Sequence, residues 1–248
     1  MIVNGFPQNP INRFIDNLTE QENTIIMRWE NPILDCSYMF NETTNIIGIN
    51  MSNFDTSEVT NMKCMFCGLP YLTSLDLSNF NTTSVNSMFC MFSECKSLTS
   101  LDLSSFDTSK VTNFLGMFNG CSSLKYLDLS NFNTSNGETI VQMFQGCSSL
   151  LSLDVSSFDT SKVTDFSWMF TNCNSLKSLN VNNFITSKAT SMRGIFYGCN
   201  SLLSLNVSSF DTSQVTDFAY MFYRCSSLKS LDLNNFITSK VKTMNQML

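Results

Sequence analysis

The sequence predicts an α/β repeat protein, a right-handed solenoid of about eight 26-residue repeats with one short parallel strand in each. The first observation is a fixed period, because phenylalanine recurs every 26 residues in two separate columns. Such a spacing is typical of stacked repeats. One column comprises Phe40, Phe66, Phe92, Phe118, Phe144, Phe170, Phe196 and Phe222, and the other comprises Phe54, Phe80, Phe106, Phe132, Phe158, Phe184, Phe210 and Phe236. These columns contain sixteen of the 22 phenylalanines, which favours a stacked core over a cofactor pocket.

The second observation is the apolar pattern inside each repeat. Leu98, Leu101, Leu103 and Phe106 follow L-x-x-L-x-L-x-x-F, the leucine-rich-repeat template. Alternation through Asp102 turns the two flanking leucines inward and the aspartate outward, as the two-residue period of a strand requires. Each repeat is therefore expected to contribute one short parallel strand to a leucine-rich-repeat-like solenoid.

The second half of each repeat predicts two further elements. A short extended piece is expected at the V-T pair. The M-F-x-x-C segment that follows predicts a tight helical turn, in which Met117, Phe118 and Cys121 share an inward face at three- and four-residue spacing.

The domain organisation follows from where the repeats begin and stop. We expect residues 1–35, which do not repeat, to cap the first repeat, and residues 36–248 to form the solenoid. Met247 and Leu248 stand where Met221 and Phe222 stand one period earlier, so we expect the C-terminal cap to be missing. The first residues lack the basic start and apolar stretch of a signal peptide. We interpret the chain as a piece of a longer protein.

The segments FDTSKVT, MFNGCSSL and LDLS together resemble the BspA-like leucine-rich-repeat surface proteins. The resemblance extends from Met39 to the C-terminus. Members of that family are typically secreted or cell-surface proteins of bacteria and some protists, implicated in adhesion to host or matrix proteins. The resemblance implies an extracellular or cell-surface location and a protein ligand. Carried over by position, the motif falls on Asp107, Thr108, Ser109 and Val111, which are scaffold positions.

Composition argues against several classes of function. A net charge of −6 with 14 scattered lysines and arginines disfavours nucleic acid as a partner. The apolar stretches are too short for insertion into a membrane. Histidine is absent, which removes Ser–His and Cys–His nucleophile pairs and histidine-based zinc sites. We therefore expect neither an enzyme nor a cofactor.

The ten cysteines allow more than one interpretation. Six of them form a column at the same period, and we expect small buried core residues with free thiols: Cys95, Cys121, Cys147, Cys173, Cys199 and Cys225. Cys64, Cys67, Cys90 and Cys95 have a spacing that leaves a zinc site open. Because Cys64 and Cys90 lie one period apart, a disulfide or a reduced pair is the alternative. We predict no metal site.

The candidate ligand-binding surface lies on the outward face of the leucine strand. It includes an aspartate column, Asp76, Asp102, Asp128 and Asp154, which continues as Asn180, Asn206 and Asp232. Either water and backbone donors or a cation such as calcium offset the repulsion along this column. Tyr126 breaks the neighbouring serine column, so Tyr126 with Lys125 is the predicted contact.

Two further features accompany that surface. Asn136, Gly137 and Glu138 replace the usual K-V-T, which predicts a local change of the backbone. An unbroken threonine column runs through Thr56, Thr82, Thr108, Thr134, Thr160, Thr186, Thr212 and Thr238. These threonines either present hydroxyls to water, as an ice-binding surface does, or bond locally to turn backbone.

The function that the sequence predicts is non-catalytic binding or adhesion at a cell surface or after secretion, with an extended repeat surface offered to protein ligands. The alternative is a structural solenoid that assembles with its own copies through the uncapped end.

Overall fold

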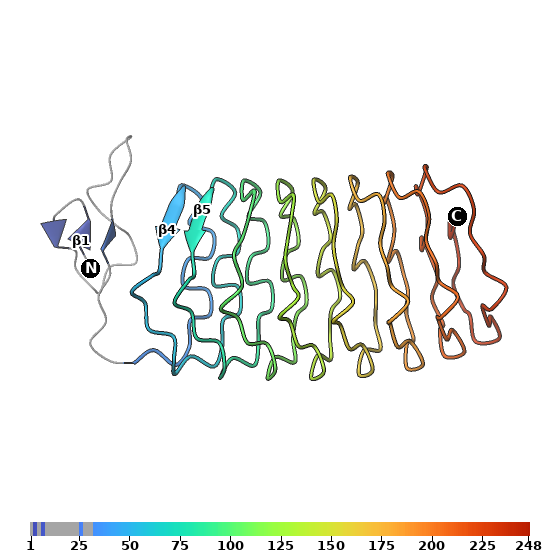
Figure 1. Ribbon diagram of the computed structural model, residues 1–248, viewed down its shortest axis with the longest axis horizontal. Coiled ribbons are helices and arrows are strands. Elements are labelled where there is room, and N and C mark those ends of the chain that lie inside the picture. The colour runs from blue at the N-terminus through green and yellow to red at the C-terminus, as the bar shows by residue number, and fades with distance from the viewer. Residues whose placement is uncertain (1, 4–5, 8–24, 27–31) are drawn as a thin grey trace. The chain divides into compact units, whose positions relative to one another are not determined.

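The computed structural model describes residues 2–3, 6–7, 25–26 and 32–248 (Figure 1). The chain divides into two compact units, Met1–Ile33 and Leu34–Leu248.

The first unit contains a small antiparallel sheet. Strand β1 (Ile2–Val3) lies between β2 (Phe6–Pro7) and β3 (Ile25–Ile26) in the order β2-β1-β3. The capping role predicted for residues 1–35 depends on side chains, such as those of Phe14 and Trp29, that lie outside the described residues, and it stays a prediction.

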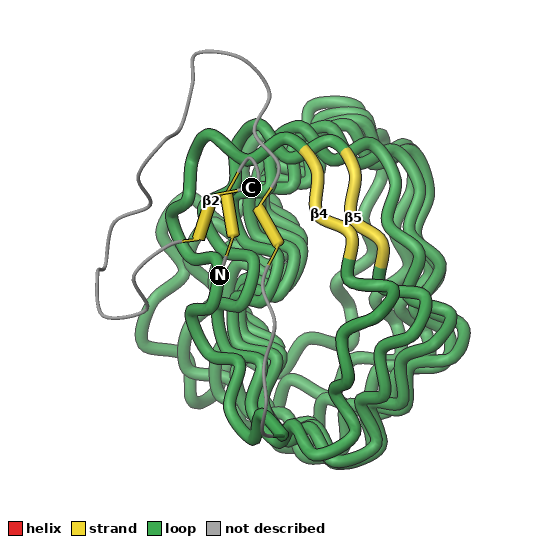
Figure 2. Tube along the Cα trace, turned by 90° about the vertical axis from the view of Figure 1, so that its left-hand side faces the viewer, coloured by secondary structure: helices red, strands yellow, loops and turns green. Residues whose placement is uncertain are grey.

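The second unit is a stack of similar turns of the chain. The turns follow one another in a single row (Figure 1), and a view along that row shows them lying one behind another (Figure 2). In the first two repeats, β4 (Gly48–Asn50) pairs in parallel with β5 (Ser74–Asp76), and Ile49 opposes Leu75. The unit is thus a repeat solenoid, while its right-handedness stays a prediction.

A backbone ladder joins the repeats where the second extended piece was expected, just after the V-T pair. Parallel bridges connect one residue of each repeat to its equivalent in the next: Asp35 to Asn61, Asn61 to Ser87, Ser87 to Asn113, Asn113 to Thr139, Asp165 to Ser191, Ser191 to Asp217 and Asp217 to Thr243. From each bridge residue onward, every second amide donates to the following repeat. For example, Cys64 N donates to Phe89 O at 2.8 Å and Phe66 N donates to Met91 O at 2.9 Å. This regular series is a parallel ladder.

The predicted leucine strand is present in only some of the repeats. Among residues 32–248, strand pairing at this segment is confined to β4 with β5 and to a single bridge between Ser178 and Ser204. The amides on either side of the segment bond within their own repeat, as Leu98 N does to Cys95 O and Phe106 N to Leu103 O. The same bonds flank the paired strand β5, at Leu72 N to Leu69 O and Phe80 N to Leu77 O, so they recur whether or not the segment pairs.

The predicted helical turn is wrong, and with it the α part of the fold class, because the described residues contain no helix. Two positions in this segment take a positive φ in every repeat, as at Cys64 (φ 52°) and Gly68 (φ 73°). Met65 N bonds to Met62 O at 3.2 Å, which makes Cys64 the third residue of a turn. A positive φ at that position is the geometry of a type II turn and ends any right-handed helix.

The predicted stacked core is confirmed. Phe66 is fully buried and lies parallel to Phe92, with ring centroids 5.8 Å apart and an interplanar angle of 5°. Phe80 from the other column meets Phe66 at 6.4 Å, so the two columns also contact each other. Each aromatic pair adds about 0.5–1.5 kcal/mol beyond the burial of its surface.

The repeat that contains Asn136, Gly137 and Glu138 in place of K-V-T interrupts the ladder on one side only. Gly137 N still bonds to Thr134 O at 2.7 Å, and Glu138 N still bonds to the preceding repeat at Thr112 O. Among the bridges in residues 32–248, however, the link from Thr139 to Asp165 is missing. The expected change of the backbone is therefore a local gap in repeat-to-repeat pairing.

Candidate functional site

The repeats differ most at four positions, which lie two, three, six and seven residues after each bridge residue. We call these positions together the variable face. The positions between them hold buried methionine and phenylalanine, such as Met169 and Phe170. In the last three complete repeats the variable face consists of Ser167, Trp168, Thr171, Asn172, Arg193, Gly194, Tyr197, Gly198, Ala219, Tyr220, Tyr223 and Arg224.

Four aromatic rings gather on this face, and we call Trp168, Tyr197, Tyr220 and Tyr223 the aromatic cluster. Trp168 stacks on Tyr220 with centroids 6.1 Å apart and meets Tyr197 edge-on at 6.0 Å. Tyr223 lies 5.8 Å from Tyr197 and 6.1 Å from Tyr220. All four residues are half-buried, so their rings remain within reach of a ligand.

Gly194 makes the stacking of Trp168 on Tyr220 possible. These two residues occupy the same column two repeats apart, and Gly194 is the residue between them. A Cβ at Gly194 would overlap Cε3 and Cζ3 of Trp168. The φ of Gly194 is +56°, and Trp168 and Tyr220 themselves take φ values of 62° and 61°. Left-handed backbone thus positions both rings, at a cost that glycine does not incur.

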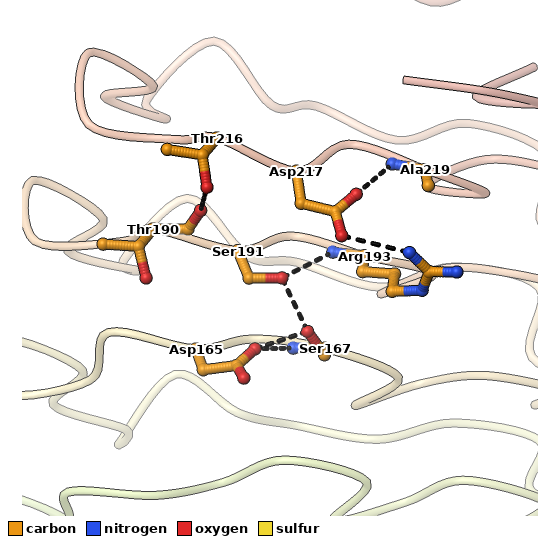
Figure 3. A network of polar contacts seen from close by, with 8 residues as sticks. All are labelled: Asp165, Ser167, Thr190, Ser191, Arg193, Thr216, Asp217 and Ala219. Carbon is orange, nitrogen blue, oxygen red and sulfur yellow. Dashed lines mark hydrogen bonds and ion pairs between the residues drawn. The ribbon is translucent and has the colours of Figure 1, made fainter. Parts of the chain in front are cut away.

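Arg193 pairs with Asp217 (Figure 3) and contacts two rings of the aromatic cluster. Its Nη1 donates to Asp217 Oδ2 at 3.1 Å, while its guanidinium carbon lies 5.6 Å from the centroid of Trp168 and 5.2 Å from that of Tyr220. Asp217 also accepts from Ala219 N at 2.8 Å, which fixes the carboxylate. Arg193 therefore makes a cation–π contact with two rings from a fixed position.

A row of polar side chains continues from this pair along the bridge column. Ser191 Oγ accepts from Arg193 N at 3.4 Å and lies 2.8 Å from Ser167 Oγ (Figure 3). Ser167 in turn donates to Asp165. The network links three successive repeats, so it stiffens the backbone from which Trp168 and Arg193 project.

The aspartates predicted to bind a ligand act as parts of the scaffold. Asp102 Oδ1 accepts from Ser104 N at 2.9 Å, and the equivalent bond recurs at Asp76, Asp128 and Asp154. The backbone N–H and then the hydroxyl of that serine lower the pKa of Asp76, Asp102 and Asp128, and the same donors, hydroxyl first, lower the pKa of Asp154. Backbone donors thus offset the charge of this column.

The predicted contact at Tyr126 is exposed but lies apart from the variable face. Tyr126 is 62% exposed, and Lys125 beside it is exposed as well. Lys125 contributes its backbone to the stack, because its N–H donates to Thr99 O and its carbonyl accepts from Leu151 N. The structure does not bring Tyr126 together with the four aspartates into one cavity, so a ligand role for these residues stays a prediction.

The threonine column bonds to backbone, as the local interpretation requires. Thr108 is fully buried, donates to Asn133 O at 2.9 Å and accepts from Asn133 N at 2.8 Å. The same pair of bonds recurs at Thr56, Thr82, Thr134, Thr160 and Thr212. Buried hydroxyls cannot present an ice-binding surface, so that alternative is wrong.

The cysteines are free thiols in the structure. The predicted column is buried from Cys95 to Cys199 and half-buried at Cys225. Each of its thiols donates to a backbone carbonyl one repeat back, as Cys121 Sγ does to Phe92 O at 3.1 Å. Burial raises the pKa of Cys67 and of Cys90 to about 11 and that of Cys95 to about 12. Within the described ranges, no group of three or more cysteine, aspartate or glutamate side chains is arranged to hold a metal ion.

Sequence reasoning missed the aromatic cluster although a signal was present. Three of the six tyrosines and one of the two tryptophans fall within the last three complete repeats, all on the variable face. Both arginines of Leu34–Leu248, Arg193 and Arg224, lie there too, and Arg224 lies 5.6 Å from the ring centroid of Tyr223. The variable face is identified when equivalent positions of all repeats are compared for variation, whereas a search for irregular residues along the leucine strand does not find it.

A family model matches the chain four times, over residues 11–124, 34–152, 97–184 and 174–248. Its description is "Mycoplasma protein of unknown function, DUF285". The chain belongs to this family. The overlapping DUF285 matches tile the sequence as expected for repeats, and a search of curated proteins finds no match. In the described part of this DUF285 chain, no helix has the length and apolar character needed to cross a bilayer.

Among solved structures, this DUF285 chain is similar to bacterial leucine-rich repeat proteins. One from Bacteroides ovatus is 18% identical with a TM-score of 0.28, and the match covers 77% of this chain and 62% of that one. A leucine-rich cell surface protein from Faecalibacterium prausnitzii is 17% identical with a TM-score of 0.26, covering 80% and 77%. A leucine-rich repeat protein from Eubacterium ventriosum is 16% identical with a TM-score of 0.33, covering 75% and 54%. The DUF285 chain thus spans about three fifths of the first of these, and its assignment as a solenoid rests on its own ladder.

Proposed function

We propose that this chain is a non-catalytic binding module that holds a protein ligand on its variable face. The observation that carries the proposal is the aromatic cluster with Arg193 fixed across it. Tryptophan, tyrosine and arginine are the residue types most enriched at the energetic centres of interfaces. Here they lie half-buried on the part of the repeat that varies, whereas the constant columns bond to backbone or fill the core.

The proposal that the module is not an enzyme rests on where its reactive groups lie. A serine or cysteine nucleophile needs an adjacent base, and the sequence has no histidine. The repeated aspartates accept from turn amides, and the repeated threonines bond to the next repeat. The thiols of the core column have raised pKa values, which keeps them protonated and unreactive at neutral pH.

The extracellular or cell-surface location and the adhesive role belong to the same proposal. They follow from the resemblance to the BspA-like proteins, whose ligands are host or matrix proteins. A neighbouring protein on the same surface is another partner of this kind. The acidic net charge of the chain supports a protein rather than a nucleic acid as the ligand.

The test is a binding comparison on beads coated with the chain. The beads are incubated with soluble fibronectin, fibrinogen, laminin and collagen, and the bound protein is quantified. The double variant Trp168→Gln/Tyr220→Gln uses the residue that the same column already holds at Gln142 and Gln246, both with positive φ. We expect at least one ligand to be retained by the native chain and bound at least tenfold less by the double variant.

The matched control is Tyr126→Ser, which restores the residue common to its column and removes the predicted contact on the strand face. It is expected to bind as the native chain does. Equal binding by the native chain and the double variant, or loss of binding in Tyr126→Ser alone, would overturn the assignment to the variable face.

Self-assembly is the second candidate, and the last repeat favours it. Met244 and Leu248 are 48% and 75% exposed, although their columns are buried elsewhere in the solenoid. A second copy or a further repeat would cover the same end. Light scattering over a dilution series in reductant distinguishes the two functions, since growth of molar mass with concentration supports assembly and a constant monomer mass refutes it.

A further inference from the structure

The aromatic cluster carries polar groups that the chain itself does not use. Within residues 32–248, the phenol hydroxyls of Tyr197, Tyr220 and Tyr223 have no hydrogen-bond partner, and neither has the indole N–H of Trp168. Tyrosine and tryptophan at a binding surface typically combine an apolar ring with one such polar group. The cluster therefore offers partly exposed aromatic rings and unused hydrogen-bonding atoms side by side.

The charge at the centre of the cluster is compensated. Arg193 pairs with Asp217 at 3.1 Å, and their side chains are 37% and 23% exposed. Both remain accessible, so the pair presents guanidinium donors next to a carboxylate acceptor. Arg193 already makes the cation–π contact with Trp168 and Tyr220. A cationic ligand would have to displace it, which disfavours such a ligand.

The arrangement of the four rings suits a ligand that extends along the repeats. An open pocket of about 380 Å³ lies at the last repeat, lined by Phe222, Arg224, Leu228 and Leu248 among others, and none of the four rings lines it. The rings instead form two rows across neighbouring repeats, with Trp168 and Tyr220 in one row and Tyr197 and Tyr223 in the other.

We infer that the aromatic cluster, with the Arg193–Asp217 pair, binds a neutral oligosaccharide. A pyranose ring has an apolar C–H face that packs on an aromatic ring and a rim of hydroxyls that both donate and accept. The exposed parts of the four rings supply the contact with the apolar C–H face. The Arg193 guanidinium, the Asp217 carboxylate and the free tyrosine hydroxyls supply the contacts with the rim of hydroxyls. Successive sugars of a linear chain follow the rows from one repeat to the next.

This inference rests on the proposed binding function and names the chemistry of its ligand, which on a protein partner is an attached glycan. Affinity electrophoresis of the intact chain tests it, with gels containing mannan, xylan or laminarin as neutral probes and polygalacturonate or hyaluronan as acidic probes. We expect at least one neutral polysaccharide to retard the native chain. Raising the salt from 0.15 to 1 M should change that retardation less than about twofold, since screening acts on charges.

Single variants test which residues cause the retardation by a neutral polysaccharide. Trp168→Gln, Tyr220→Gln and Arg193→Ala should each weaken the retardation at least tenfold, whereas Tyr126→Ser should leave it unchanged. Ala219 occupies the same column as Arg193, so the arginine variant suits the fold, and circular dichroism checks that each variant remains folded. Retention of the full effect in folded Trp168→Gln would place sugar binding elsewhere and overturn the inference.

The remaining outcomes separate this inference from the proposed function. If no neutral polysaccharide retards the chain while beads still capture a matrix protein through Trp168 and Tyr220, the sugar inference fails and the protein-binding function stands. Retardation by acidic probes alone, abolished by salt, would show a charge-driven site and also overturn the inference. Sugar binding without capture of any matrix protein would uphold the inference and refute a protein ligand.

Discussion

Replacing Thr108 by valine tests the hydrogen-bonding role of the buried threonine column. The hydroxyl of Thr108 makes two bonds to the next repeat, at 2.9 Å to Asn133 O and 2.8 Å from Asn133 N. Each bond contributes about 1 kcal/mol net, and an unpaired buried partner costs about 1–3 kcal/mol. Thr108→Val preserves the shape and removes both bonds, so we expect a loss of about 2–4 kcal/mol in the free energy of unfolding.

Thr108→Ser provides the opposite perturbation, because it keeps the hydroxyl and removes one buried methyl group. That change costs about 1 kcal/mol. Thr112→Val, four residues on, is the control for a half-exposed threonine and should cost less than about 0.5 kcal/mol. Urea denaturation of the three variants gives the free energies of unfolding, with Thr108→Val expected to be the least stable.

Hydrogen exchange localises the same effect, because repeats of a solenoid can open separately. The Asn133 amide should exchange about 30-fold faster in Thr108→Val, which corresponds to about 2 kcal/mol at 1.4 kcal/mol per tenfold. If Thr108→Val is as stable as the native chain and Thr108→Ser is the weaker variant, the column acts by packing alone and the hydrogen-bond reasoning is wrong.

Three further predictions follow from the backbone, the thiols and the aspartates. Gly194→Ala should lower the melting temperature more than Gly146→Ala and should alter tryptophan emission. Both variants add a Cβ at positive φ, but only Gly194→Ala displaces Trp168. Equal melting temperatures and equal emission spectra for the two variants would contradict this prediction. At pH 8 the thiols of the folded chain should react with a disulfide reagent far more slowly than the thiols of the chain unfolded in urea. Since burial raises the folded pKa of Cys36, Cys67 and Cys90 from 9.0 to about 11, their contribution to stability should be full below about pH 9 and fall as the pH rises toward 11. The aspartates with lowered pKa should stabilise the fold above about pH 3.8 and lose that contribution as the pH falls further, which an acid titration followed by circular dichroism measures. A titration curve that is flat from pH 5 to pH 2 would show that these carboxylates do not support the turns.

Several parts of the fold could be predicted because they depend on residues that recur. The phenylalanine columns and the cysteine column are read directly from the period, and stacking equivalent residues fixes what they contact. The leucine segment was harder to predict. Its alternation fixes which side chains face inward, but it does not determine which backbone amides reach the next repeat, and pairing in the described residues is confined to β4 with β5 and to Ser178 with Ser204.

The left-handed positions explain why the helical turn was expected wrongly. Glycine marks this backbone at Gly116 and Gly194, but cysteine, tryptophan and tyrosine occupy the same column elsewhere, also with positive φ. The ladder to the next repeat holds these residues in a conformation that costs about 1–2 kcal/mol in isolation. Residue type therefore does not predict a positive φ at positions where the stacking of repeats determines the backbone conformation.

The same backbone connects the scaffold to the proposed site. A left-handed residue turns its side chain out of the core while its amide stays in the ladder, as at Trp168, whose N–H donates to Arg193 O at 2.9 Å. Substitution at such a position changes the surface and leaves the core contacts of Met169 and Phe170 intact. The two turn positions of each repeat are thus free to vary, and a ring at one repeat meets a ring two repeats away only because Gly194 lies between them. Specificity can change in this solenoid without any change in the residues that hold it together.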